Sequence, residues 1–323
     1  MNENQNNACT KDIPSSTELM EIIRKTISNV WNIGNRLHQP CIDRWLDNFD
    51  GEALFNDYCD KEKAAQREKQ LALFLLCNFV FYNENEVKYL VKMMFSKYSH
   101  SVFESEEKQW ICSDDYDALI EKTQFSFLGE ISESSSYLLY HFRQENDLSK
   151  QCFREGDKTE NIVFIDDFSI TGSQAAEYFK EKREEKTWDK NRKIYILLMI
   201  ATEEALETMA QIEDVTILSC IVLDDKSKAF SDTSIIFNGY KREFVDEAKK
   251  MCEYYGDRII KPNMKGMKAL GFGGGGYLMG TYYNIPDNTL PIFWSSLNNW
   301  NYLFKRYDKK YGSESASIGG YYV

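Results

Sequence analysis

Two adjacent carboxylates, Asp166 and Asp167, stand where a run of four apolar residues ends. The run, 162–165, predicts a short buried strand, and ligands in open α/β sheets bind beyond the carboxyl ends of strands. From such a place the two acids can accept hydrogen bonds from the hydroxyls of a ribose. They can also hold a Mg²⁺ ion through water. The acid pair is therefore the first candidate for chemistry.

The residues after the acids favour phosphate binding. Thr171, Gly172 and Ser173 lead into a helical pattern, and a helix N-terminus presents unpaired N–H groups and a partial positive charge. Gly172 allows the backbone to approach a phosphate closely, and the hydroxyls of Ser169, Thr171 and Ser173 can add hydrogen bonds. The alternative is an acidic strand-to-helix loop in which Thr171 or Ser173 is an ordinary cap.

Residues 162–173 resemble the phosphoribosyl-pyrophosphate signature of type I phosphoribosyltransferases. The resemblance implies that Asp166 and Asp167 are the catalytic pair, that they bind the ribose hydroxyls, and that they hold Mg²⁺ through water. It implies that the next six residues bind the 5'-phosphate: Ser169, Ile170, Thr171, Gly172, Ser173 and Gln174. The family often has hydroxyl residues where this chain has Ile170 and Gln174. Backbone N–H groups can still hold a phosphate, so binding survives these changes more easily than full activity.

The family also has a pyrophosphate-binding loop after its first core strand. Gly129, Ser134 and Ser135 occupy the corresponding place here, although serines that begin a helix are common caps. Catalytic members carry a long flexible loop between the next helix and the signature strand. The interval here, 146–160, is short, with Arg154 and Lys158 as candidate phosphate contacts. Either the chemistry differs, or the site binds without the usual transfer.

The acid pair belongs to a pattern of alternating strands and helices. We expect strands at 125–128, 162–165, 193–200, 215–223 and 277–285, separated by helices at 134–145, 173–186, 202–212 and 240–255. The fold class is therefore α/β, a parallel sheet with a mainly helical N-terminal region. The resemblance implies that the sheet is Rossmann-like and of the phosphoribosyltransferase type. We expect a disordered tail (1–16), the helical region (17–118), the phosphoribosyltransferase-like domain (119–297) and a C-terminal extension (298–323). A long helical stretch is expected over about 42–97.

The segment 282–294 is a second candidate for the pocket wall. Pro286 and Pro291 stiffen it, and Asn288 and Thr289 are polar within an apolar stretch; a packed C-terminal corner is the equal alternative. Residues 271–276 fit the pattern GxGxxG. We discount them as a dinucleotide site because no clear strand precedes them and a strand follows.

Composition excludes several classes of protein. With 43% hydrophobic and 28% charged residues, the chain is an ordinary globular protein, and its net charge of −12 argues against a broad nucleic-acid footprint. The eight cysteines form no CxxC pair, which is typical of reduced thiols, and the three histidines lack the spacing of a zinc site. No signal peptide or membrane span is expected, and 71–82 is better explained as a core helix, so a cytoplasmic location is expected.

Residues 124–294 further resemble the phosphoribosyltransferase-like (PRTase-CE) proteins of bacterial conflict systems, which occur with retron reverse transcriptases and other anti-phage modules. The resemblance implies an effector that acts on nucleotides or nucleic acid. Its partners would be phosphoribosyl pyrophosphate or a nucleotide, and a reverse transcriptase–nucleic-acid complex or other defence protein.

Three functional hypotheses remain open at this point. The first is a Mg²⁺-dependent enzyme of glycosyl transfer, and the second is a nucleotide or phosphosugar sensor that does not turn its ligand over. The third is a structural partner of a ribonucleoprotein, which would need a localised basic face. The motifs GxSxG, HExxH and GxxxxGK[ST] do not occur.

Overall fold

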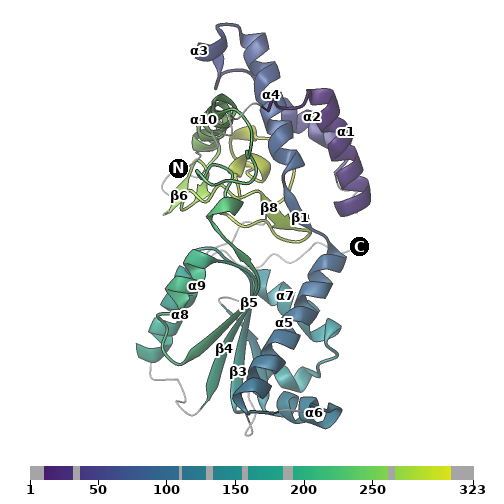
Figure 1. The fold of residues 1–323 in the computed structure, drawn as a ribbon, viewed down its shortest axis with the longest axis vertical. Coiled ribbons are helices and arrows are strands. Elements are labelled where there is room, and N and C mark those ends of the chain that lie inside the picture. Colours follow the sequence, from purple (N-terminus) through teal and green to yellow (C-terminus); the bar gives the residue numbers. More distant parts are fainter. Residues whose placement is uncertain are drawn as a thin grey trace, which may run out of the picture.

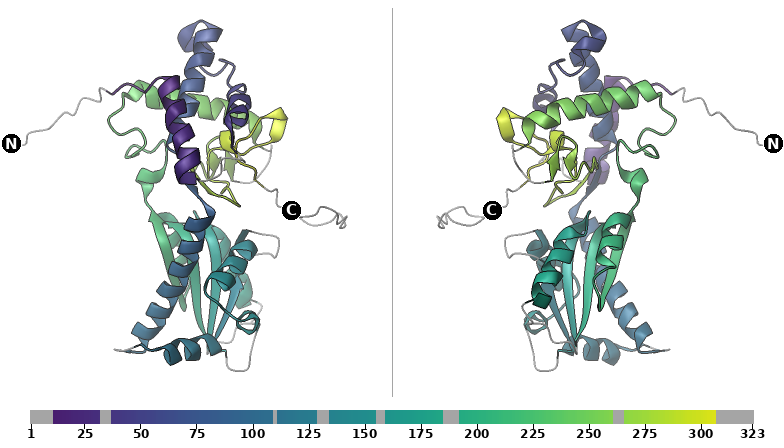
Figure 2. Two further views of the ribbon diagram at one scale, coloured as in Figure 1. Left: turned by 90° about the vertical axis from the view of Figure 1, so that its right-hand side faces the viewer. Right: turned by 90° about the vertical axis from the view of Figure 1, so that its left-hand side faces the viewer.

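The structure is a computed structural model of the 323-residue chain, and it describes residues 11–31, 37–108, 111–128, 134–154, 159–184, 192–260 and 266–306. These residues form two lobes, one above the other in Figure 1. The sheet lobe comprises residues 83–227, and the helical lobe comprises 11–82 together with 228–306. Each lobe has its own buried apolar cluster. Both side views in Figure 2 show the same division.

The sheet lobe is built on four strands. These are β2 (Thr123–Phe127), β3 (Asn161–Ser169), β4 (Lys193–Thr202) and β5 (Val215–Leu223). They lie in the order β2-β3-β4-β5 and every pair is parallel, with Val163 opposite both Phe125 and Tyr195. Strand β4 is buried from Ile194 to Thr202, as expected for a central strand covered on both faces. The predicted parallel sheet is confirmed.

Helices cover both faces of this sheet. On one face α5 (Glu84–Ser105) and α7 (Ser134–Glu145) pack on the odd-numbered side chains of β3, such as Val163. On the other face lie α8 (Ser173–Glu184) and α9 (Glu203–Met209), where Phe179 meets Phe164. Two short helices, α6 (Ser113–Glu121) and the 3₁₀ turn η2 (Lys150–Phe153), lie before β2 and β3.

The connections of the sheet create a suitable place for a ligand. β2 leads to α7 on one face, whereas its neighbour β3 leads to α8 on the opposite face. Ligands of open α/β sheets bind where adjacent strands lead to opposite faces. The connections from β2 to β3, from β3 to β4 and from β4 to β5 all advance in the same direction across the sheet. Because the helix of the first connection lies on the opposite face from the helices of the other two, the first connection has the opposite handedness. Nearly all such connections in proteins are right-handed, which makes this arrangement unusual.

The helical lobe joins the two ends of the described chain. Its helices are α1 (Ser16–Thr26), the π-helical turn η1 (Ile27–Trp31), α2 (Gln39–Leu46), α3 (Phe55–Tyr58), α4 (Lys61–Cys77) and α10 (Arg242–Ile259). Trp45 from the N-terminal part stacks on Phe293 from the C-terminal part, with ring centroids 5.4 Å apart. A helical N-terminal region is thus confirmed.

The long helical stretch expected over about 42–97 is mostly helical, but a strand interrupts it. Strand β1 (Val80–Tyr82) separates α4 from α5 and pairs in parallel with β8 (Met279–Thr281). β-branched and aromatic residues favour a strand here, and Asn83 begins α5 through a capping box with Glu86. Local helical periodicity could not reveal this strand, because its partner lies about 200 residues further along the chain.

The C-terminal part contains mostly short elements. They are η3 (Asp225–Ser227), β6 (Met267–Lys268), β7 (Gly271–Phe272), η4 (Pro291–Phe293) and η5 (Leu297–Asn299). The strand expected at 277–285 is reduced to β8, which pairs with β1 rather than with the main sheet. The expected domain boundaries stay a prediction. α5, which lies before the expected boundary at 118, packs on β4 and β5 of the sheet.

Candidate functional site

Asp166 and Asp167 lie inside strand β3 rather than in a loop after it. The expected strand ended at Ile165, but the ladder continues because β4 runs on to Thr202 and pairs Asp166 with Leu198 and Ser169 with Ala201. The two acids are 8% and 2% exposed. Adjacent strand residues project to opposite faces of a sheet, so the two carboxylates are presented separately and not as one flat pair.

Both carboxylates are held by hydrogen bonds. Asp166 Oδ1 accepts from the backbone N–H of Asp167 at 2.9 Å, and Asp167 Oδ1 accepts from the N–H of Phe168 at 3.0 Å. Asp167 Oδ2 accepts from the Asn284 side-chain amide at 2.9 Å. Asn284 follows β8, so this last contact joins the helical lobe to the sheet lobe.

The turn after β3 is fixed by core contacts. Ile170 is 8% exposed and packs against Tyr277 and Met279 of the helical lobe, and its carbonyl accepts from Thr202 Oγ1 at 2.6 Å. The side chain of Ile170 therefore has a packing role, and only its backbone is suited to a ligand. Ser169 Oγ lies 3.9 Å from the Met209 sulfur, a weak contact.

Gly172 is required by α9. Its φ is +69°, a conformation that side chains rarely adopt, and an added Cβ would meet the Ala205 carbonyl oxygen at 2.7 Å. The glycine thus has a structural reason independent of any phosphate.

The start of α8 is open to solvent. Thr171 Oγ1 accepts weakly from the Ser173 N–H at 3.4 Å, and Ser173 and Gln174 are exposed. The N-terminal turn of α8 therefore lies at the same sheet edge as the acids, with its partial positive charge available to an anion.

The second predicted loop is only partly visible. Ser134 and Ser135 form the first turn of α7, after β2, but their side chains lie outside the described structure, as does Gly129. Arg154 follows η2, which packs on β2 just before β3 begins, so it lies at the amino edge of the sheet. This places Arg154 away from the strand ends that carry the acids, and its role as a phosphate contact stays a prediction. Lys158 lies outside the described residues.

An aromatic cluster lines the Asp167 side of the site: Tyr137, Tyr140 and His141 from α7, with Tyr282 and Tyr283 after β8. The Tyr282 hydroxyl is 3.0 Å from His141 Nε2. Burial lowers the pKa of His141; the negative charge of Glu84 opposes this shift, and the positive charge of Lys88 adds to it. The Tyr283 hydroxyl is buried without a hydrogen-bond partner.

Sequence reasoning pointed to the right segment and to the wrong residues in it. Asn288 and Thr289 do not face the acids, because their side chains donate to the carbonyls of Phe272 and Met279. Asn284 and Tyr283, which do approach Asp167, carried no pattern of their own. Residues 271–276 form a turn closed by backbone hydrogen bonds and lead to no helix, in keeping with their rejection as a dinucleotide site.

The donor set is compatible with Mg²⁺ held jointly with a ligand. No group of three or more His, Cys, Asp or Glu side chains that could hold a metal occurs in the described parts of the chain. Mg²⁺ usually keeps several waters and binds one or two carboxylates plus substrate phosphates, so one of the two aspartates would suffice for that mode. The seven cysteines that the structure describes are free thiols.

Fold and site together define a protein of the α/β class with an acid pair and a helix N-terminus at the carboxyl edge of a parallel sheet. The PRTase-CE family model matches residues 42–306, and the chain belongs to that family. A solved orotate phosphoribosyltransferase from Aeropyrum pernix is similar at 13% identity, over 35% of this chain and 73% of the other, with a TM-score of 0.22. No curated protein matches. Among the described residues no helix is long and apolar enough to cross a membrane.

Proposed function

We propose that the chain binds a phosphoribosyl or nucleotide ligand together with Mg²⁺ at the carboxyl edge of β3. The observation that carries this proposal is that two buried aspartates and the exposed first turn of α8 stand on one strand-turn-helix unit. Asp166 and Asp167 accept from ribose hydroxyls, and the backbone N–H groups from Thr171 to Gln174 hold the phosphate. Ile170 contributes only backbone.

Two activities fit this site. In an enzyme of glycosyl transfer, the acids would stabilise the positive charge that develops on the ribose as pyrophosphate or a base departs. In a sensor, ligand occupancy would be relayed to the helical lobe without turnover. The bond from Asn284 to Asp167, which joins the two lobes, supports the sensor.

The biological setting follows from family resemblance alone. We propose an effector role in bacterial anti-phage defence, of the retron type or similar. Candidate partners are a reverse transcriptase–nucleic-acid complex or another defence protein. The net charge of −12 favours a protein partner over direct contact with nucleic-acid backbone.

The test is calorimetric titration of the full chain with phosphoribosyl pyrophosphate and Mg²⁺. We expect saturable binding that is lost in the double variant Asp166→Asn/Asp167→Asn and kept in Asp114→Asn/Asp117→Asn, a matched pair exposed on α6. A pyrophosphate-release assay on the same proteins separates the two activities. If the wild type binds neither this ligand nor any of a panel of nucleotides, the proposed function is wrong.

A further inference from the structure

The buried hydroxyl of Tyr283 is the unexplained polar group of the site. Among the described residues it is the buried side-chain oxygen or nitrogen that has no hydrogen-bond partner. A buried polar group left unpaired is costly, and nearly all such groups in native proteins are satisfied. An unpaired donor beside a ligand site therefore points to a partner that arrives with the ligand.

The position of Tyr283 connects it to the acid pair. The next residue, Asn284, donates to Asp167 Oδ2 at 2.9 Å. Burial, followed by the negative charge of Asp167, raises the pKa of Tyr283 well above its usual value. At neutral pH the group is therefore a neutral O–H donor close enough to the Asp167 carboxylate to interact with it, although the contact does not reach hydrogen-bond geometry.

Neighbouring rings limit how far the Tyr283 side chain can move. Its ring centroid lies 4.8 Å from that of Tyr137 and 5.2 Å from that of Tyr282. Tyr282 is itself held by His141 at 3.0 Å. The ring is packed between two segments, α7 and the residues after β8, so the hydroxyl is held in place before any ligand binds.

We propose that the Tyr283 hydroxyl donates a hydrogen bond to a sugar hydroxyl of the ligand, and that this sugar hydroxyl donates in turn to Asp167. A hydroxyl group is both a donor and an acceptor, so one ligand oxygen satisfies the free donor and the carboxylate together. A carbon-bound hydrogen can do neither. Tyr283 is thereby a specificity-determining residue, which makes the site select ribose over deoxyribose.

This inference rests on the proposed function, because it needs a phosphosugar at Asp167. The matched substitution is Tyr283→Phe, which removes the hydroxyl and keeps the ring. The control is Tyr282→Phe, since the Tyr282 hydroxyl already has a partner in His141. Each full-length protein is titrated with phosphoribosyl pyrophosphate and with ribose 5-phosphate and its 2-deoxy and 3-deoxy forms, all with Mg²⁺. The melting temperature of each unliganded protein is measured in parallel.

We expect the wild type to bind ribose 5-phosphate about 100-fold more tightly than one of the deoxy forms, because that form loses two hydrogen bonds of about tenfold each. In Tyr283→Phe the bond from the sugar hydroxyl to Asp167 remains, so the discrimination should fall to about tenfold. The variant should bind phosphoribosyl pyrophosphate about tenfold more weakly, and the melting temperature of the unliganded protein should be unchanged or raised. Tyr282→Phe should keep the discrimination.

Two results would overturn the assignment alone: binding that depends on Asp167 but is equal in wild type and Tyr283→Phe, or a discrimination between ribose and deoxyribose forms that is undiminished in Tyr283→Phe. A lower melting temperature with unchanged discrimination would likewise show a merely structural hydroxyl. If the wild type binds no phosphosugar at all, the proposed function and the assignment both fail.

Discussion

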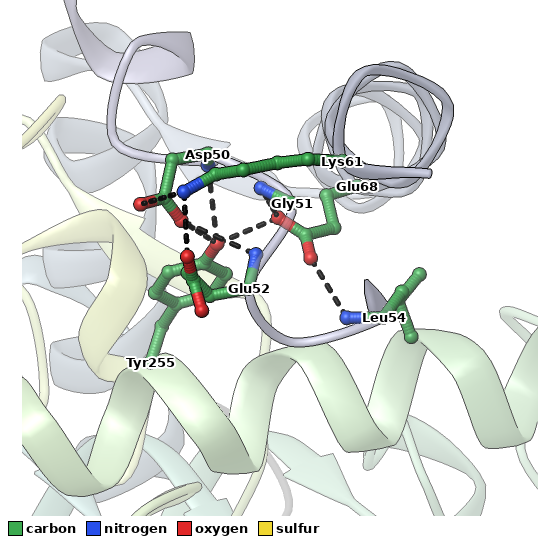
Figure 3. Close-up of polar contacts among 7 residues, drawn as sticks. All are labelled: Asp50, Gly51, Glu52, Leu54, Lys61, Glu68 and Tyr255. Carbon is green, nitrogen blue, oxygen red and sulfur yellow. Dashed lines mark hydrogen bonds and ion pairs between the residues drawn. The ribbon is translucent and has the colours of Figure 1, made fainter. Parts of the chain in front are cut away.

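The molecule buries carboxylates in two regions, and the hydrogen bonding around the carboxylates differs between the two. In the helical lobe, Glu68 is fully buried, and it accepts from the N–H of Gly51 at 2.8 Å, the N–H of Leu54 at 2.9 Å and the Tyr255 hydroxyl at 2.6 Å (Figure 3). In the sheet lobe, Asp167 is 2% exposed, and beside it the Tyr283 hydroxyl lacks a partner.

The difference indicates which carboxylate is structural. Every donor around Glu68 comes from the fold itself: the loop between α2 and α4, and α10 through Tyr255. Burial and the hydrogen bond to Glu68 raise the pKa of Tyr255 well above its usual range, so it remains a donor. A closed network of this kind holds a loop in place. The Tyr283 hydroxyl beside Asp167 is the group that a ligand would complete.

Amide substitution of Glu68 should give the largest loss of stability. In Glu68→Gln one carboxylate oxygen becomes an NH₂ group that faces a donor, and charge-assisted bonds to the loop are lost. We expect the free energy of unfolding to fall by about 3–5 kcal/mol. Urea denaturation measures it, with Glu62→Gln, exposed on the same helix, as the control. A loss below about 1 kcal/mol would remove the contrast between the two regions.

Gly172→Ala should give the second-largest loss of stability. The substituted residue keeps a positive φ and its Cβ would meet the Ala205 carbonyl, so we expect a loss of about 3 kcal/mol. Gly239→Ala is the matched control, because its φ is +82° but no atom lies within 4 Å of the added Cβ. We expect about 1 kcal/mol there. Equal losses in the two variants would show that packing against α9 does not matter.

The matched substitution Asp167→Asn should affect stability little and binding strongly. The amide keeps one acceptor, and relief of a buried charge offsets the lost bond, so we expect a change within about 1 kcal/mol in urea. Affinity for phosphoribosyl pyrophosphate should fall about 10- to 100-fold, the value of a hydrogen bond to a charged group. Stability loss comparable to that of Glu68→Gln would make Asp167 a structural carboxylate as well.

The contrast also explains what the sequence could predict. The β3-turn-α8 unit is local, and its apolar run, acids and helix start lie within about fifteen residues, so its place in a parallel sheet was predictable. The extension of β3 to Ser169 was not, because it depends on how far β4 runs alongside.

The hydrogen-bond partners of Asp167 could not be predicted from the sequence either. Asn284 reaches it only because β8 pairs with β1, two short strands about 200 residues apart in sequence. Three-residue strands carry too little periodicity to be detected from sequence. A tyrosine such as Tyr283 is recognised as a candidate site residue only when the structure places it beside a carboxylate.

The smallest effect concerns pH and tests whether the aromatic cluster is packed as described. Because burial lowers the pKa of His141 from 6.5, the unfolded chain takes up a proton at a higher pH than the folded one. The effect of His141 on the free energy of unfolding is therefore absent above the pKa of the imidazole in the unfolded chain. The free energy of unfolding declines as the pH falls from about 7.5 toward about 5.5. We expect this decline to be shallower in His141→Asn, and NMR titration of the imidazole should give a midpoint below 6.5. A midpoint at or above that value would mean that the imidazole is solvated and that the aromatic cluster around His141 is packed more loosely than described.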